Sequence, residues 1–165
     1  MPGGARQRAT YEELLNLPEN TTGEIIDGEL TVTPRPSRSH IYTASSLDKK
    51  LGPPYQFGEG GGPGGWKQER FPRAEDHNWI SVAPDWVCEV LSSNTARFDR
   101  VKKMPVYARH EVSFCWLIDP VLTTLEVFKL ESGRWFLFGA YAGAQKVRVE
   151  PFSAIEIDLS LLWLE

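Results

Sequence analysis

One acidic residue interrupts an apolar segment near the middle of the chain. Residues 85–91 read DWVCEVL and are mostly apolar on both alternating faces, which is typical of a strand that is covered on both sides. Glu89 breaks this pattern. A buried carboxylate must be paired, protonated or bound to a metal ion, because an unpaired buried charge costs several kcal/mol or shifts its pKa strongly. Glu89 is therefore the first candidate for chemistry, and an ion pair with a neighbouring basic residue is the alternative explanation.

A basic segment follows this strand and is predicted to form a helix. Residues 92–95 read SSNT and favour a turn and a helix N-cap, and residues 97–109 are dense in helix formers. Residues 114–118 read FCWLI and are followed by Asp119-Pro120, which indicates a second buried strand. The three segments together predict a βαβ unit. Glu89 lies about 7 Å before the end of its strand and Lys103 about 9 Å along the returning helix, so the two side chains can share one level.

Two faces of this helix compete for contact with the sheet. The apolar face leaves Lys103 nearly opposite and comprises Phe98, Val101, Met104, Pro105 and Ala108. Asp99, Lys103 and Tyr107 form a second stripe at intervals of four residues. Either Asp99 and Lys103 form a solvated helix pair worth about 0.3–0.5 kcal/mol, or Lys103 faces the sheet. Pro105 affects both alternatives, because it removes a helical hydrogen bond and can kink the helix.

These segments carry a family resemblance. The stretches APDWVCEVLSSNT, DRVKKMPVYAR, FCWLIDP and TLEVFKLESGRW, with EIIDGEL near the start, resemble the Uma-type restriction endonuclease family of the PD-(D/E)XK nuclease superfamily. The resemblance covers most of the chain and implies an α/β fold with a restriction-endonuclease-like central mixed β-sheet flanked by helices. It also implies that Mg²⁺ or Mn²⁺ supports hydrolysis of DNA phosphodiester bonds. In that scheme Glu89 is a metal ligand and Lys103, at the DRxxK position, orients the attacking water, with Lys102 as the fallback.

The chain departs from this family in one segment. Relatives carry a strand with a PD motif, whose aspartate is a metal ligand, between the GGxGGW-like and RxERxPR-like segments. Here Trp66 runs directly into KQERFPR, so that strand is missing. A second carboxylate ligand must then come from elsewhere. The candidates are Glu24 in the N-terminal hairpin and Glu75 or Asp76 in the loop that follows.

Asp85 is a further candidate catalytic residue on the strand of Glu89. The two carboxylates cannot share one metal ion on a regular strand, because four residues span about 13 Å although both side chains point to the same face. His40 follows a PxxSxxH arrangement that is seen in relatives. A histidine at the start of a helix is, however, more often a capping or surface residue.

Composition sets the wider limits. The chain has 165 residues, of which 41% are hydrophobic, and this predicts one domain over residues 10–165 after a flexible tail of residues 1–9. The net charge of −4 gives no general attraction for DNA, so binding would depend on local basic clusters such as Arg97, Arg100 and Lys102. Cys88 and Cys115 fall in predicted buried strands without metal-type spacing, and the sequence shows no leader and no membrane-length apolar run. We therefore expect a cytoplasmic protein with no membrane partner.

Several flanking elements complete the predicted fold. Thr10 and Glu13 fit a capping box for a helix over residues 11–17, and Asp27-Gly28 fits a hairpin turn. Ser39 is a candidate cap for a helix over residues 40–51, and the glycine-rich residues 58–65 are best explained as a connector. A short strand is predicted over residues 79–82. The segments TLEVFKL, RWFLFGAY, KVRVE and AIEID predict a C-terminal antiparallel meander that extends the sheet, and residues 159–164 a last helical turn.

Three hypotheses follow for function. The first is a Mg²⁺-dependent DNA endonuclease, which the retained Glu89 and Lys103 favour. The second is a nuclease fold without catalysis that serves as a binding or dimerisation module, which the missing strand and the acidic net charge favour. The third is a shortened chain whose fold is compromised. A homodimer is a possible assembly, because nucleases that cut both strands of DNA are often dimeric.

Overall fold

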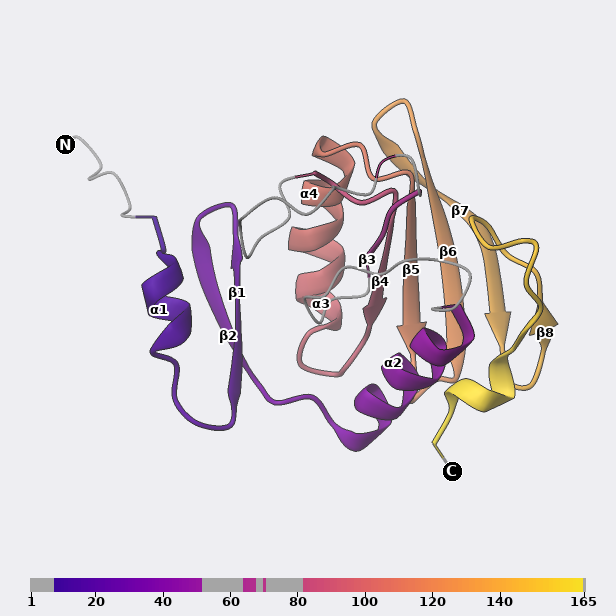
Figure 1. Cartoon of the computed structure of the whole chain (residues 1–165), viewed down its shortest axis with the longest axis horizontal. Helices are drawn as coiled ribbons and strands as arrows, with labels where there is room; N and C mark the ends of the chain where they lie inside the picture. Colours follow the sequence, from indigo (N-terminus) through magenta and orange to yellow (C-terminus); the bar gives the residue numbers. More distant parts are fainter. Residues whose placement is uncertain (1–7, 52–63, 68–69, 71–81, 165) are drawn as a thin grey trace. The chain divides into compact units, whose positions relative to one another are not determined.

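The chain forms two compact units in a computed structural model, which describes residues 8–51, 64–67, 70 and 82–164 (Figure 1). The first unit ends at Pro36 and the second begins at Ser37. The single domain expected over residues 10–165 stays a prediction, because the compactness of each unit does not measure whether the two fold together. The glycine-rich connector, apart from Gly64 and Gly65, and almost all of the strand expected at residues 79–82 lie outside the described residues.

The first unit consists of a short helix and a β-hairpin. The helix α1 (Tyr11–Leu15) begins at the predicted capping box, in which the Thr10 amide donates to Glu13 Oε2 at 2.6 Å and the Glu13 amide donates to Thr10 Oγ1 at 3.4 Å. The strands β1 (Thr21–Ile26) and β2 (Glu29–Pro34) pair antiparallel around Asp27 and Gly28. These two turn residues have φ angles of 53° and 80°, as the tight hairpin turn requires. Both sequence predictions are confirmed.

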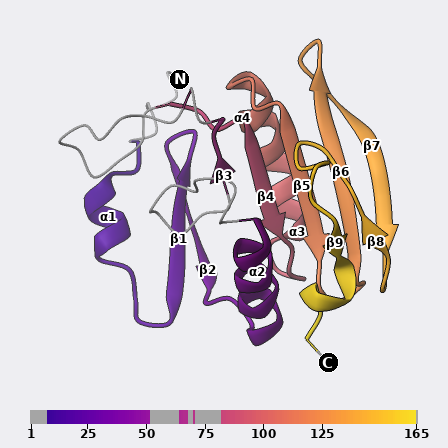
Figure 2. The same ribbon diagram turned by 45° about the vertical axis from the view of Figure 1, so that its right-hand side comes forward.

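The second unit is built on a mixed sheet. Within the described residues its strands follow the order β3 (Gly64–Gly65), β4 (Trp86–Val90), β5 (Phe114–Asp119), β6 (Thr124–Glu131) and β7 (Arg134–Ala142). The pair β4–β5 is parallel and the other pairs are antiparallel. Figure 2 shows β4 to β7 side by side. The predicted α/β class, the βαβ unit and an antiparallel meander through β5, β6 and β7 are therefore confirmed.

Each face of this sheet is covered by helical segments. One continuous helical segment returns from β4 to β5 and comprises α3 (Ala96–Phe98), a π-helical turn η1 (Asp99–Lys103) and α4 (Met104–Arg109). Its residues pack with Val87 and Leu91 of the β4 region and with Leu117 of β5. The helix α2 (Arg38–Leu51) and the 3₁₀ turn η2 (Leu159–Leu162) pack against the opposite face. The first residue of α2 comes two positions before the predicted start, because Ser37 rather than Ser39 caps it and accepts the His40 amide at 3.3 Å.

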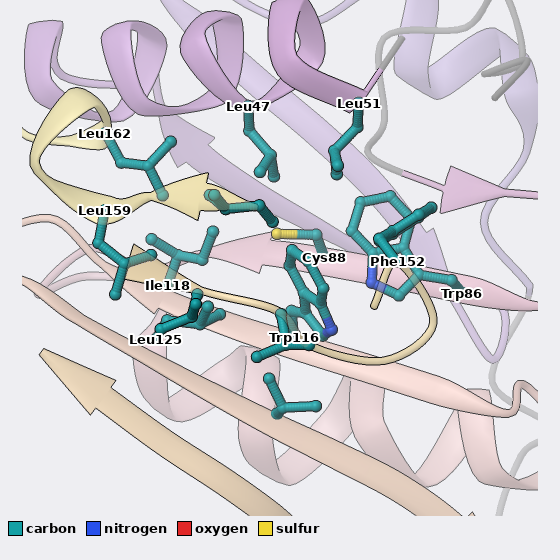
Figure 3. Packing of buried hydrophobic residues seen from close by; sticks show 14 residues of the cluster. Leu47, Leu51, Trp86, Cys88, Trp116, Ile118, Leu125, Phe152, Leu159 and Leu162 are labelled. Carbon is teal, nitrogen blue, oxygen red and sulfur yellow. The ribbon is translucent and has the colours of Figure 1, made fainter. Parts of the chain in front are cut away.

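The larger core cluster lies on the α2 side of the sheet (Figure 3). Trp86 and Trp116, from the parallel strands, and Phe152 form three edge-to-face ring contacts with centroids 4.9–5.4 Å apart. Leu47 and Leu51 of α2 close the cluster from above, as Figure 3 shows. Aromatic contacts of this geometry add to the free energy gained by burying the rings. The cluster therefore fixes β4 and β5, and with them the backbone that carries Glu89.

The last two strands depart from the prediction. β8 (Lys146–Val147) and β9 (Ile157–Asp158) pair with each other in a separate two-stranded ladder and do not extend the main sheet. Val147, Val149 and Ile157 are buried in the larger core cluster. The segment between the two strands makes turns, and Pro151 has no N–H to donate to a ladder. The alternating apolar residues of this segment therefore pack over the face of the main sheet. The predicted last helical turn is confirmed at η2.

Candidate functional site

The candidate site is centred on Glu89, near the end of β4. Its side chain is on the face of the sheet that the α3–α4 segment covers, and it is 15% exposed. Lys103 Nζ donates to Glu89 Oε2 at 3.1 Å, and the Tyr107 hydroxyl donates to Oε1. Both carboxylate oxygens of Glu89 therefore have donors from the returning helix. The level that the sequence predicts for Glu89 and Lys103 is confirmed, and of the two orientations it left open, Lys103 faces the sheet.

A second carboxylate lies on the other side of Lys103. Asp99 Oδ1 is 3.1 Å from Lys103 Nζ, and the side chains of Asp99 and Lys103 are 2% and 6% exposed. This contact has ion-pair distance without hydrogen-bond geometry, because Oδ1 accepts no hydrogen bond within the described residues. The solvated Asp99–Lys103 pair that the sequence left open is therefore wrong. The pair is buried, and its ammonium lies between two carboxylates.

The helix exposes its apolar Val101 and buries Lys103. Val101 is 60% exposed and Lys103 is 5% exposed, although the apolar stripe predicted the reverse. Pro105 is exposed and has no N–H to donate to the Val101 carbonyl. Water can satisfy that carbonyl only if the helix side that carries Val101 and Pro105 faces solvent. The Met104 amide donates instead to the Asp99 carbonyl, five residues back, which makes the π turn. The carboxylates of Glu89 and Asp99 offset the cost of burying the Lys103 ammonium. The helix face that carries Lys103 therefore turns toward the sheet.

Burial and charge act in opposite directions on Glu89. Desolvation raises the pKa of its carboxyl group above the ordinary value and outweighs the lowering by the Lys103 charge and by the Tyr107 hydrogen bond. Asp99 adds a smaller effect that raises this pKa. His40, at the start of α2, is within electrostatic range of the same charges. Burial lowers its pKa, Asp99 opposes this and Lys103 adds to it.

Asp85 lies at the opposite end of β4 and has partners of its own. It forms an ion pair with Arg70, and its Oδ2 accepts the Lys67 amide at 2.8 Å. Its backbone carbonyl accepts the amides of Ser113 and Phe114, both at 3.1 Å. The carboxylate thus ties the segment after β3 to the start of β4. The structure does not bring Asp85 to Glu89, and a catalytic role for Asp85 stays a prediction.

The other candidate ligands belong to other parts of the chain. Glu24 lies on β1 in the first unit, where it is opposite Thr31 in the hairpin. Glu75 and Asp76 lie outside the described residues. No group of three or more histidine, cysteine, aspartate or glutamate side chains suited to a metal ion occurs in the described part of the chain. A Mg²⁺ ion bound at Glu89 would therefore take its remaining ligands from water, from a substrate phosphate or from another carboxylate.

Within the described residues, the edge of β4 opposite β5 has only a short partner strand. β3 pairs only with Trp86 and Val87, through Gly65 and Gly64 respectively. Over residues 8–51, 64–67, 70 and 82–164, no strand pairs at the level of Glu89 with the edge of β4 opposite β5.

Two partners in the site were not assigned a role from the sequence. Tyr107 holds Glu89 and Asp99 holds Lys103. The four-residue spacing of Asp99, Lys103 and Tyr107 was the sequence signal for these contacts. The apolar periodicity favoured another face of the helix for contact with the sheet. Among the basic residues proposed to contact phosphate, Arg100 is paired with Glu126 at 3.0 Å. Arg97 and Lys102 are exposed.

The fold and this buried acid–lysine pair define a nuclease-like α/β protein. Residues 64–161 match the family model described as "Uma2: Putative restriction endonuclease", and because this covers more than half of the sequence, the chain belongs to that family. A search of curated proteins found no match. The fold is similar to that of a putative nuclease belonging to DUF820 from Anabaena variabilis, with a TM-score of 0.66 and 24% identity over 92% of this chain and 96% of that one. Of the helices that the structure describes, none is both long and apolar enough to cross a bilayer.

Proposed function

We propose that the chain is a metal-dependent DNA endonuclease in which Glu89 is a ligand of Mg²⁺ or Mn²⁺. The observation that carries this proposal is the 3.1 Å contact between Glu89 and Lys103. Such enzymes need carboxylates around a hard cation and a nearby lysine that orients or acidifies the attacking water. Membership of the family supports the same assignment.

A second carboxylate is proposed to complete the coordination of the cation at Glu89. Glu24 and Asp76 remain the proposed sources, since a hard divalent cation takes oxygen ligands and commonly binds through one or two carboxylates. Arg97 and Lys102 are proposed to contact DNA phosphates from the exposed side of the helix, where each contact would make binding weaker at higher salt. A homodimer would allow both strands of the duplex to be cut.

A plasmid-nicking assay tests the proposal. Supercoiled DNA is incubated with the full chain and Mg²⁺ or Mn²⁺, in parallel with Glu89→Gln, Lys103→Met and Glu131→Gln. Glu131 pairs with Lys129 on the surface at 2.9 Å, so its variant controls for the loss of a carboxylate. We expect nicking by the wild type and by Glu131→Gln, and rates lower by about a hundredfold or more in the two site variants. Equal rates in Glu89→Gln and the wild type would refute the role of Glu89.

One observation favours a second function, a DNA-binding or dimerisation module without catalysis. Both oxygens of Glu89 already accept hydrogen bonds from Lys103 and Tyr107. A cation would have to share these oxygens with both donors and would be repelled by the nearby Lys103 ammonium. DNA binding without cleavage under any divalent cation would support this function over the endonuclease.

A further inference from the structure

We propose that Asp99 is a positioning residue, whose carboxylate holds the Lys103 ammonium at Glu89 and keeps it there when Glu89 engages another group. The catalytic consequence of this role rests on the proposed nuclease function. The positioning itself is a property of the folded chain.

The ammonium is held from two sides. Lys103 Nζ is 3.1 Å from Glu89 Oε2 on β4 and 3.1 Å from Asp99 Oδ1 on its own helix. It also lies 5.9 Å from the centre of the Phe98 ring, a distance at which a cation is attracted to the ring face. A lysine side chain loses much rotamer freedom when it is fixed, so a single hydrogen bond holds it weakly. The second anchor gives the ammonium one position.

Asp99 is suited to be the permanent anchor of the two. It is 1% exposed, and its backbone carbonyl accepts the Met104 amide within the π turn, so both its backbone and its side chain are confined. Lys103 follows four residues later on the same segment, which places the two side chains on one face. Glu89 lies on another element and also accepts from Tyr107, and its side chain is more exposed, at 15%.

The unbonded oxygen of Asp99 supports the same role. Oδ1 is buried and accepts no hydrogen bond within the described residues, so Lys103 is the cation that offsets the cost of burying this charge. Asp99 lies in the first turn of η1, where a carboxylate also interacts favourably with the helix dipole, but that interaction does not require burial. The burial of Asp99 beside Lys103 is explained if the lysine must stay at the site when Glu89 no longer accepts its hydrogen bond.

Lysine acylation measures this positioning without DNA or a metal ion. The folded protein is treated briefly with N-hydroxysuccinimidyl acetate, and mass spectrometry gives the labelling rate of Lys103 relative to the exposed Lys102. In Asp99→Asn we expect Lys103 to be labelled about tenfold faster than in the wild type, because one of its anchors is lost. In Glu131→Gln, which breaks the exposed pair with Lys129, the rate at Lys103 should be unchanged. A rate in Asp99→Asn within about twofold of the wild type would overturn the proposal.

The Glu89→Gln variant provides a second test of the proposal, which can be used even if Asp99→Asn does not fold. With Glu89 neutral and Asp99 intact, Lys103 should remain slow to label. Fast labelling in Glu89→Gln would show that Glu89 alone holds the lysine, and would overturn the proposal.

The functional arm compares cleavage with DNA affinity. Asp99→Asn should lower the single-turnover cleavage rate while the DNA Kd, measured by fluorescence anisotropy, stays within about twofold of the wild type, because Asp99 acts through Lys103. Equal loss of rate and affinity would contradict a positioning role. Absence of cleavage by the wild type would refute the proposed nuclease function, and the labelling rates would still decide whether Asp99 positions Lys103.

Discussion

Removing the charge of Lys103 should destabilise the fold strongly. Its ammonium is the cation beside both Glu89 and Asp99, and the side chains of Lys103, Glu89 and Asp99 are 6%, 15% and 2% exposed. Lys103→Met keeps much of the apolar stem but leaves two neighbouring carboxylates without their cation. Breaking a buried ion pair in this way costs about 3–5 kcal/mol, which for a chain of this size corresponds to a fall in Tm of about 10 °C.

The loss should depend on pH in a defined direction. Burial already raises the pKa of Glu89, and Lys103 is the largest influence that lowers it, so the variant raises this pKa further. A carboxyl group whose folded pKa exceeds its unfolded value of about 4.3 contributes most stability below that value, and the contribution is lost as the pH rises through the folded pKa. The deficit of Lys103→Met relative to the wild type should therefore shrink between pH 7 and pH 5.

Urea unfolding, followed by tryptophan fluorescence, measures both effects. Lys129→Met is the matched control, because Lys129 forms an exposed ion pair with Glu131 and its loss should cost less than about 1 kcal/mol at either pH. The reasoning is refuted if Lys103→Met unfolds within about 1 kcal/mol of the wild type at pH 7 and shows no greater pH dependence.

Three further predictions concern the surroundings of the site. Tyr107→Phe should lower the free energy of unfolding by about 1.5–3 kcal/mol, since it removes a hydrogen bond to the Glu89 carboxylate, and urea titration at pH 7 would show this; a neutral result would contradict that bond. Met104→Ala should cost about 2–4 kcal/mol and Val101→Ser less than about 0.5 kcal/mol, and the opposite ranking would mean that Val101 rather than Met104 packs against the sheet. Burial raises the pKa of the Cys88 thiol well above its ordinary value, so Ellman's reagent at pH 8 should label it slowly in the folded protein and quickly in urea; equal rates would contradict its burial.

The sequence predicted the parts of the fold that local signals determine. The capping box at Thr10, the turn at Asp27 and Gly28, and the two buried strands around the basic helix all follow from residue types at fixed spacing. The common level of Glu89 and Lys103 also followed, because the rise per residue of a strand and of a helix sets it.

The rotation of the returning helix could not be predicted in the same way. Apolar periodicity placed Val101 toward the sheet, whereas the structure places Asp99 and Lys103 there. The helix rotation depends on Glu89, a carboxylate from another element, and on the side of the helix where Pro105 leaves the Val101 carbonyl without a hydrogen bond. The first is a tertiary effect and the second a local backbone effect, and the apolar periodicity of the segment contains neither. The separate β8–β9 ladder was missed for a similar reason, because an alternating pattern does not say which sheet a strand joins.

The central claim is that Glu89 belongs to a site that binds a divalent cation, and calorimetric titration with Mn²⁺ tests it most directly. The wild type, Glu89→Ala and Glu131→Gln are titrated in parallel at pH 7. We predict saturable binding by the wild type and by Glu131→Gln, and none by Glu89→Ala, which would show that a further carboxylate completes the site. Absence of binding by all three proteins would contradict the claim and favour the module without catalysis, and binding that survives in Glu89→Ala would place the cation elsewhere.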